Sequence, residues 1–218
     1  KIGVRNTTVV GDTRFDRVLE ICRQAKELPI VEQFKGNAVT LVAGSSWAPD
    51  EDIFIPYFNA HPKMKLIIAP HVIDESHIKE IIGKLDRTVV RYTQATPETV
   101  AQADCLIIDC FGLLSSIYRY GEIAYIGGGF GVSIHNTLEA AVYGMPVIFG
   151  PNNKKFQEAQ DLLVCKGGFE ILGAQDFNQL MDRFLTDNSF LDKAGKKAGN
   201  YVRDNSGALE KIMHEISF

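Results

Sequence analysis

Short apolar runs alternate with segments of helical periodicity along nearly the whole chain. The apolar runs predict strands over residues 37–46, 65–71, 87–92, 104–110, 122–129, 146–150 and 168–172. The segments between them predict helices over residues 14–28, 50–61, 74–85, 97–103, 112–121, 136–144 and 155–167, followed by about 45 residues of helical pattern. Residues 6–12 are interpreted as a short first strand or a linker. Because most of the strands are almost continuously apolar, the pattern predicts an α/β fold with a doubly wound parallel sheet and helices on both faces.

Small and polar residues follow five of the predicted strands. They are Gly44-Ser45-Ser46, Pro70-His71, Phe111-Gly112, Gly127-Gly128-Gly129 and Gly150-Pro151-Asn152. In an open parallel sheet, ligands bind in a crevice outside the carboxyl ends of the strands. We therefore expect these five strand ends to face one ligand-binding crevice.

The three consecutive glycines are followed by a predicted helix that starts near Asn136. Glycines tolerate positive φ and close backbone approach, so such a loop can direct N–H groups at an anion, with the positive end of the helix dipole beside it. Glu139 lies one turn on, on the same face as Asn136, and its two oxygens suit a pair of ribose hydroxyls. Together, these features predict a nucleotide site.

Each of these residues also has a purely structural interpretation. Asn136 and Glu139 match the N-x-x-E form of a capping box, which needs no ligand. His71 and His135 are equally compatible with partly buried structural histidines, Ser45 and Ser46 with loop caps, and Phe111 with a core residue. The glycines are harder to explain structurally, because a simple turn needs only one or two. The chain has neither a G-x-G-x-x-G nor a Walker pattern at this loop, which disfavours those classes.

Composition narrows the function further. A formal net charge of −4 argues against a general nucleic-acid binder, which needs clustered Lys and Arg. The four cysteines, Cys22, Cys105, Cys110 and Cys165, show no CxxC spacing, so we expect free thiols in a reducing compartment and no metal site. No run approaches the roughly 18 to 20 apolar residues of a membrane helix, and no signal peptide is visible. The chain opens on Lys1 rather than Met, so we expect it to be a piece of a longer protein.

Four stretches resemble one known family. The strongest is YGEIAYIGGGFGVSIHNTLEAAVYGMPVIFGP at 120–151, with a G-G-x-loop-H-N-x-L-E-A-A core. GDTRFDRV at 11–18, AGSS at 43–46 and NSGALEKI at 205–212 support it. Together they resemble the C-terminal half of the 3-deoxy-D-manno-octulosonic acid (Kdo) transferases over nearly the whole chain.

The resemblance implies the Rossmann-like C-terminal domain of a GT-B glycosyltransferase, which would make residues 1–218 the domain that binds CMP-Kdo. By position, Gly127, Gly128, Gly129, Asn136 and Glu139 would bind the CMP phosphate and ribose. His71 and His135 would border the same site, Ser45 and Ser46 would line the donor cleft, and Phe111-Gly112 would border the cytosine. At two positions the chain departs from the family: His71 follows Pro70 directly where the family often has an intervening Arg, and Leu113 stands where it has Glu.

The resemblance also implies the chemistry, an inverting transfer of Kdo to a lipid A precursor in lipopolysaccharide biosynthesis, without a metal or a cofactor. The catalytic base and the acceptor site would lie in an N-terminal domain that this chain lacks, so we expect the fragment alone to be soluble and inactive. The full-length protein would work at the cytoplasmic face of the bacterial inner membrane. Two alternatives stay open: a UDP-sugar transferase or epimerase domain, and a nucleotide-binding module without chemistry of its own.

Overall fold

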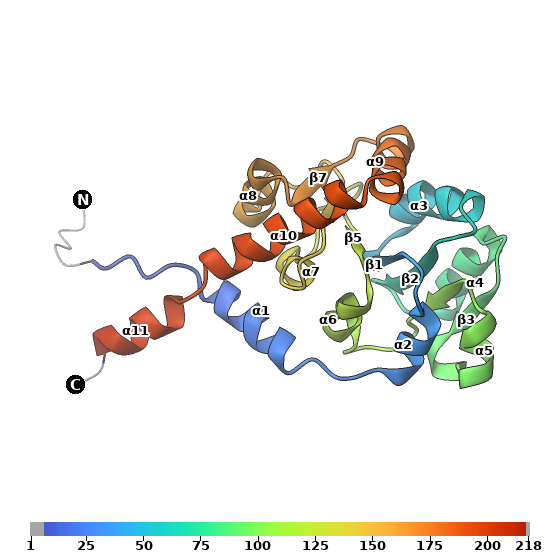
Figure 1. Cartoon of the computed structure of the whole chain (residues 1–218), viewed down its shortest axis with the longest axis horizontal. Coiled ribbons are helices and arrows are strands. Elements are labelled where there is room, and N and C mark those ends of the chain that lie inside the picture. The colour runs from blue at the N-terminus through green and yellow to red at the C-terminus, as the bar shows by residue number, and fades with distance from the viewer. Residues whose placement is uncertain (1–6, 217–218) are drawn as a thin grey trace.

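The computed structural model describes residues 7–216, which form one parallel sheet covered by helices (Figure 1). The strands are β1 (Thr40–Ser46), β2 (Lys65–Pro70), β3 (Val89–Arg91), β4 (Cys105–Ile107), β5 (Ile123–Ile126), β6 (Val147–Phe149) and β7 (Gly168–Glu170). The α-helices are α1 (Thr13–Arg23), α2 (Pro29–Lys35), α3 (Ala48–Ala60), α4 (Glu75–Lys84), α5 (Pro97–Gln102), α6 (Leu114–Ile117), α7 (Leu138–Ala141), α8 (Gln157–Cys165), α9 (Ala174–Thr186), α10 (Asn188–Asp204) and α11 (Ala208–Ile216).

All seven strands are parallel, in the order β3-β4-β2-β1-β5-β6-β7. On one side of β1 lie β2, β3 and β4, with β4 inserted between β2 and β3, and on the other side β5, β6 and β7 follow in chain order. The reversal falls between β1 and β5, where an open sheet of this class leaves its ligand crevice. This topology confirms the predicted doubly wound α/β fold.

The two faces of the sheet bury separate hydrophobic cores. Alternate strand residues such as Val42, Ile67 and Val147 pack into the core on the side of α1, α2, α5 and α7. Their neighbours, among them Leu41 and Ile148, pack into the core on the side of α3, α4 and α9. With both faces covered, nearly every position of the central strands β1, β2, β4, β5 and β6 is buried, which explains the continuous apolar runs in the sequence.

The helix predicted over 14–28 is shorter in the structure, and the helix that follows it was not predicted. α1 ends at Arg23, and the separate helix α2 begins with Pro29 in its first turn. Between them, the backbone N–H of Lys26 donates to Ser116 Oγ at 3.1 Å and that of Leu28 donates to the Tyr120 hydroxyl at 2.7 Å. Tertiary hydrogen bonds of this kind satisfy the backbone without a helix, and the local pattern does not reveal them.

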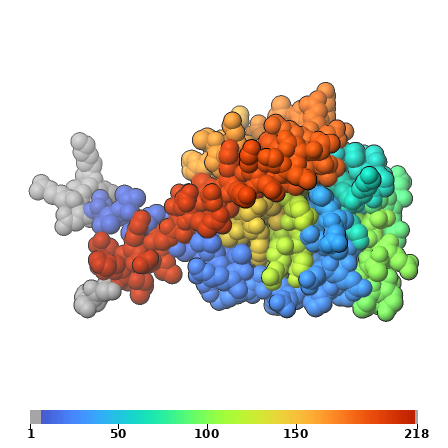
Figure 2. All heavy atoms as spheres, viewed as in Figure 1, coloured from blue at the N-terminus to red at the C-terminus, as the bar shows by residue number. Residues whose placement is uncertain are grey.

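Two further predictions at the chain's ends differ in outcome. Residues 7–12 form no regular element, and residue 6, the start of that predicted segment, lies outside the described residues. The helical pattern of the C-terminal region is confirmed as α9, α10 and α11. α11 and residues 7–12 extend from the body as one protrusion (Figures 1 and 2).

Candidate nucleotide-binding site

The end of β1 carries an unusual backbone conformation. Ser45 has φ 52°, and the pairing of β1 with β2 slips between Gly44 and Ser46. The left-handed region costs a non-glycine residue roughly 1 to 2 kcal/mol. Strain of this kind is typical of functional sites, and here it lies at the reversal point of the sheet.

The glycine loop after β5 packs tightly against this strand end. The Gly127 amide donates to Gly44 O and the Gly128 amide donates to Asp50 Oδ2, both at 2.9 Å. A Cβ added at Gly127 would lie 2.6 Å from Ser46 Cα, and one at Gly128 would run into the Ser133 carbonyl. The expectation that these two amides point at a phosphate is therefore wrong, because both are already used inside the protein.

Gly129 is also a close-packing position. A Cβ there would lie 2.6 Å from Gly150 Cα, where the β5 and β6 loops cross. Gly128 has φ 90°, which favours glycine whatever the space. The three glycines thus let the backbones of three strand ends approach one another, and they shape the crevice instead of contacting its ligand through Gly127 and Gly128 amides.

The side chain of Asp50, a residue not predicted from the sequence to belong to the site, holds the glycine loop against the end of β1. Its buried carboxylate accepts from the Trp47 amide at 3.0 Å, the Tyr125 hydroxyl at 2.9 Å and the Gly128 amide. Burial raises the pKa of Asp50, although these three donors act in the opposite direction. The carboxylate therefore links the β1 end, the β5 strand and the glycine loop.

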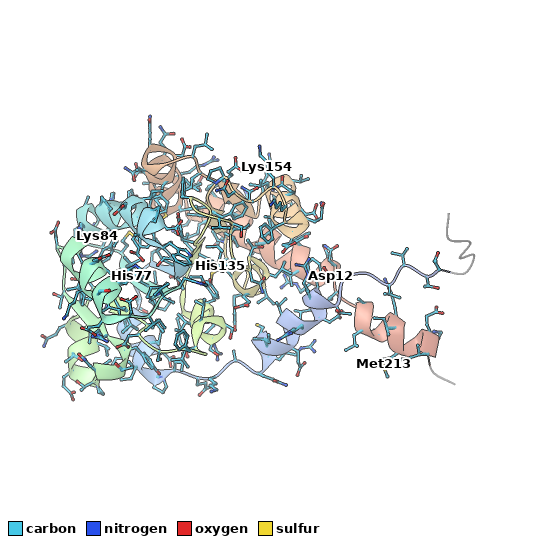
Figure 3. The ribbon with its side chains drawn as sticks, turned by 180° about the vertical axis from the view of Figure 1, so that it is seen from behind. Asp12, His77, Lys84, His135, Lys154 and Met213 are labelled. Atoms are coloured by element: carbon cyan, nitrogen blue, oxygen red, sulfur yellow. The ribbon has the colours of Figure 1, made fainter. Side chains whose placement is uncertain are left out.

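Three rings form a stack across the mouth of the crevice. Trp47 lies 4.5 Å from His71, and His71 lies 4.5 Å from His135, measured between ring centroids. Trp47 Nε1 donates to His135 Nε2 at 3.3 Å. Burial, followed by the neighbouring His71, lowers the pKa of His135, so its ring is neutral near pH 7 with the proton on Nδ1. In the view of Figure 3, the His135 label lies between those of His77 and Asp12.

Asn136 and Glu139 are bonded to each other. Asn136 Nδ2 donates to Glu139 Oε1 at 3.0 Å, and Asn136 Oδ1 accepts from the Leu138 amide at 3.0 Å. The reciprocal capping box is therefore not formed. α7 begins at Leu138, two residues later than predicted, and its four residues leave little helix dipole for an anion. Burial raises the pKa of Glu139, with Asn136 and then Arg17 acting against it.

Side chains of the predicted site line three adjoining cavities. The first, about 240 Å³, includes Ser45, His71, Phe111 and Gly112 in its wall. The second, about 580 Å³, is lined by His135, Asn136 and Glu139 together with Arg14 and Arg17, and the third, about 250 Å³, by Trp47, Gly128 and His135. The second and third cavities share His135, and His71 of the first stacks on that ring, so the three lie side by side; we refer to them together as the crevice. Phe111 is 82% exposed at its rim, so the core interpretation of Phe111 is wrong.

Ser46 does not line any of these cavities. Its side chain is fully buried, and its hydroxyl donates to Glu51 Oε1 at 3.0 Å. Glu51 in turn contacts His77 Nε2 at 2.9 Å, so Ser46 belongs to a buried polar cluster behind the crevice. The predicted cleft role is therefore wrong for the Ser46 side chain. Gly127 and Gly129 are likewise buried and absent from the cavity walls.

Two arginines add positive charge that the site prediction did not include. Arg14 is held by Glu158 Oε1 at 2.9 Å and by Asp12 Oδ2 at 2.7 Å. Arg17, one turn further along α1, forms no ion pair with an acidic side chain within residues 7–216. Both arginines stand in the GDTRFDRV stretch that carries part of the family resemblance. They were not assigned to the site, because this stretch lies far along the chain from the glycine loop and only the fold brings it to the cavity of Glu139.

No family model matches the chain. Among curated proteins, the 3-deoxy-D-manno-octulosonic acid transferase of Rickettsia bellii is 27% identical over 225 residues, which cover all of this chain and 53% of that protein. The corresponding transferase of Aquifex aeolicus is 29% identical over 175 residues, covering 78% of this chain and 45% of that protein. The chain thus spans about half the length of these relatives.

Solved structures with the same fold include domains of glycosyltransferases. The C-terminal CMP-Kdo binding domain of WaaA from Acinetobacter baumannii superposes with a TM-score of 0.68 and 20% identity, covering 88% of this chain and 99% of that one. Anabaena HepE in complex with UDP-glucose gives a TM-score of 0.61 at 12% identity, covering 87% of this chain and 52% of that one.

The fold is therefore that of the Rossmann-like domain of GT-B glycosyltransferases. In sequence, the chain is similar to the Kdo transferases, and the resemblance seen in its motifs is confirmed by matches that cover 78 to 100% of the chain. Within residues 7–216, the structure contains no helix with the length and apolar character needed to span a bilayer.

Proposed function

We propose that this chain is the donor-binding domain of a glycosyltransferase that moves Kdo from CMP-Kdo to a lipid A precursor in lipopolysaccharide biosynthesis. The observation that carries the proposal is the sequence match to Kdo transferases, which covers 99 to 100% of this chain. The UDP-sugar enzymes share the fold at only 10 to 13% identity, which favours the Kdo assignment over a UDP-sugar transferase or epimerase.

The crevice offers the groups that a cytidine nucleotide requires. In this proposal Glu139 accepts from the ribose hydroxyls, and Asn136, bonded to it at 3.0 Å, fixes the orientation of its carboxylate. His135 presents Nδ1–H to the phosphate, because its Nε2 is occupied by Trp47. Arg17 takes the phosphate role first assigned to the glycine amides, since it lines the same cavity as Glu139. The cavity beside Ser45 and Phe111 receives the base.

The chemistry assigned to this half is stabilisation of the leaving group. As the bond between the anomeric carbon and the CMP phosphate oxygen breaks, negative charge grows on the phosphate, and the Arg17 guanidinium with the His135 N–H stabilises it. An acceptor hydroxyl attacks the opposite face of the sugar and loses its proton to a base outside this chain, so the transfer inverts the anomeric centre without a metal. The complete enzyme would act at the cytoplasmic face of the inner membrane.

Calorimetric titration of the chain with CMP, UMP and AMP in the presence of EDTA tests the proposal. We expect CMP to bind and UMP to bind at least about tenfold more weakly, which corresponds to one lost hydrogen bond or more at the base. Tighter binding of UMP would support the UDP-sugar alternative, and a requirement for Mg²⁺ would contradict the metal-free site.

An activity assay separates the donor domain from a complete enzyme and from a regulatory module. The chain alone should transfer no Kdo from CMP-Kdo to a lipid A precursor, because the base and the acceptor site are assigned to the other half. Addition of the N-terminal half of a Kdo transferase of this kind should restore transfer if the chain is a catalytic donor domain. Binding of CMP with no restored transfer would favour a nucleotide-binding module.

A further inference from the structure

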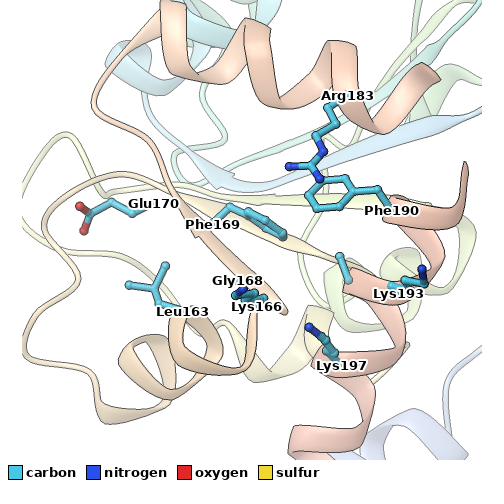
Figure 4. A pocket seen from close by; sticks show the side chains of 10 residues that line it. Leu163, Lys166, Gly168, Phe169, Glu170, Arg183, Phe190, Lys193 and Lys197 are labelled. Carbon is cyan, nitrogen blue, oxygen red and sulfur yellow. The ribbon is translucent and has the colours of Figure 1, made fainter. Parts of the chain in front are cut away.

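A separate cavity lies beside the edge strand β7, away from the nucleotide crevice. It has a volume of about 750 Å³ and is walled by β7, the end of α8, and the facing sides of α9 and α10 (Figure 4). None of its lining residues lines a cavity of the crevice. Any ligand it holds is therefore separate from the proposed donor.

Four basic side chains surround this cavity: Lys166, Arg183, Lys193 and Lys197. None of them forms an ion pair within the described part of the chain, residues 7–216. The one acid in the wall, Glu170, accepts from Asn153 Nδ2 at 2.6 Å. The wall thus carries four positive charges against one negative charge, in a protein whose net charge is −4.

The fold places these cations on one side. Lys193 and Lys197 are one turn apart on α10 and point along the same face. Lys166 ends α8 in the left-handed conformation, φ 61°, a position that usually carries glycine. The Arg183 guanidinium stacks on the Phe190 ring at 3.6 Å (Figure 4). This stacking fixes the plane of the guanidinium while its N–H groups remain available.

The floor of the cavity is aromatic. Phe169 of β7 and Phe190 of α10 lie with ring centroids 5.7 Å apart, and both are only partly buried. An apolar floor beneath cationic groups lowers the local dielectric constant, so an anion bound here gains more from each charge than it would on an open surface. Ammonium groups and a guanidinium fork together are the donors that proteins use for phosphate.

We propose that this cavity is a binding site for a phosphate-bearing ligand, either a free organic phosphate or the headgroup of an anionic lipid. The phosphate would contact Lys193, Lys197 and Arg183, and the remainder of the ligand would lie against Phe169 and the edge of the Phe190 ring, whose faces are covered by Arg183 and Phe184.

Titration with inorganic pyrophosphate, followed by calorimetry, tests the site. Binding should weaken as the salt concentration is raised from about 50 to 200 mM, because exposed charges are screened. Lys197→Ala should reduce affinity roughly tenfold, and Lys193→Ala/Lys197→Ala further still. Lys196→Ala is the matched control, since it removes the same charge from the next position of α10 but does not line the cavity. These variants should leave CMP affinity and the unfolding midpoint unchanged.

A second arm distinguishes the two sources of phosphate. Cosedimentation with phosphatidylcholine vesicles that contain phosphatidylglycerol, lost in Lys193→Ala/Lys197→Ala but not in Lys196→Ala, would identify a lipid headgroup. Pyrophosphate binding without vesicle binding would identify a soluble phosphate ligand. If neither probe binds, or if Lys196→Ala weakens binding as much as Lys197→Ala, the site is overturned.

Discussion

Replacing Gly127 by alanine should lower the free energy of unfolding, because the backbone of β1 occupies the space that the added methyl group needs. The added Cβ would lie 2.6 Å from Ser46 Cα and closer still to the Ser45 carbonyl oxygen. Neither neighbour is the end of a flexible side chain. Ser45 is already in a strained conformation, and the Gly127 amide is tied to Gly44 O at 2.9 Å.

To accommodate the methyl group, β1 and β5 must separate at the point where they are hydrogen-bonded. Overpacking in a well-packed interior costs typically 1 to 3 kcal/mol, and a clash with backbone atoms, which cannot move aside as a side chain can, belongs at the upper end, so we expect about 3 kcal/mol or more. In a domain of this size, each kcal/mol lowers the midpoint of thermal unfolding by roughly 2 to 4 °C, which gives a shift of about 6 to 12 °C.

Thermal and urea unfolding of Gly127→Ala, followed by circular dichroism, measures this cost. Gly83→Ala is the control, because a Cβ at Gly83 has no neighbour within 4 Å and alanine is the better helix former in α4. It should be neutral or slightly stabilising. Wild-type stability in Gly127→Ala, combined with a loss of nucleotide affinity, would refute the packing role and restore the view that the glycine loop contacts the phosphate.

Three further predictions concern named carboxylates and their partners. Glu139→Gln should cost about 1 to 3 kcal/mol of CMP affinity with little change in the unfolding midpoint, whereas equal losses of both would contradict a ribose contact. Asp50→Asn should lower the free energy of unfolding by about 2 to 4 kcal/mol, measured in urea, because an amide cannot accept from all three donors that face it. A loss below about 1 kcal/mol would argue against the role of Asp50 in joining β1, β5 and the glycine loop. Burial alone would lower the pKa of His77, but the hydrogen bond and charge of Glu51 outweigh burial, and the pKa is raised. The His77–Glu51 pair therefore stabilises the fold fully below about pH 6.5, the ordinary pKa of histidine, and this stabilisation is lost as the pH rises through the raised pKa. The stability deficit of His77→Gln should therefore shrink between about pH 6 and pH 9, and a deficit that grows would show that the sign is wrong.

The order of strands and helices could be read from the sequence because the strands are buried on both faces. Seven apolar runs became seven strands, although several are shorter than predicted, β4 being Cys105–Ile107 within the run 104–110. The separate helix α2 could not be read, because what divides it from α1 is a pair of hydrogen bonds to Ser116 and Tyr120, about 90 residues away in the chain.

The sequence predicted where the candidate site lies, but not which atoms its residues contact. At the carboxyl ends of the strands, His71 stacks on His135, and His135 lines the same cavity as Glu139, as expected for an open parallel sheet. The roles of the glycines and of Ser46 could not be predicted, since whether an amide or hydroxyl faces solvent or another backbone depends on packing. Trp47 carries no motif of its own, and Arg17 stands in the GDTRFDRV stretch, far from the glycine loop along the chain, so only the fold brings them beside His135 and Glu139.

In the function proposed above, a cytidine nucleotide binds in the crevice beneath the Trp47–His71–His135 stack. Trp47 is the only tryptophan of the chain, and it lies in that stack, so its fluorescence reports on this crevice alone. Titration with CMP in EDTA should change the Trp47 emission saturably, with the same affinity that calorimetry gives, and Glu139→Gln should shift the curve to higher CMP concentration. CMP binding by calorimetry with no change in Trp47 emission would contradict the claim.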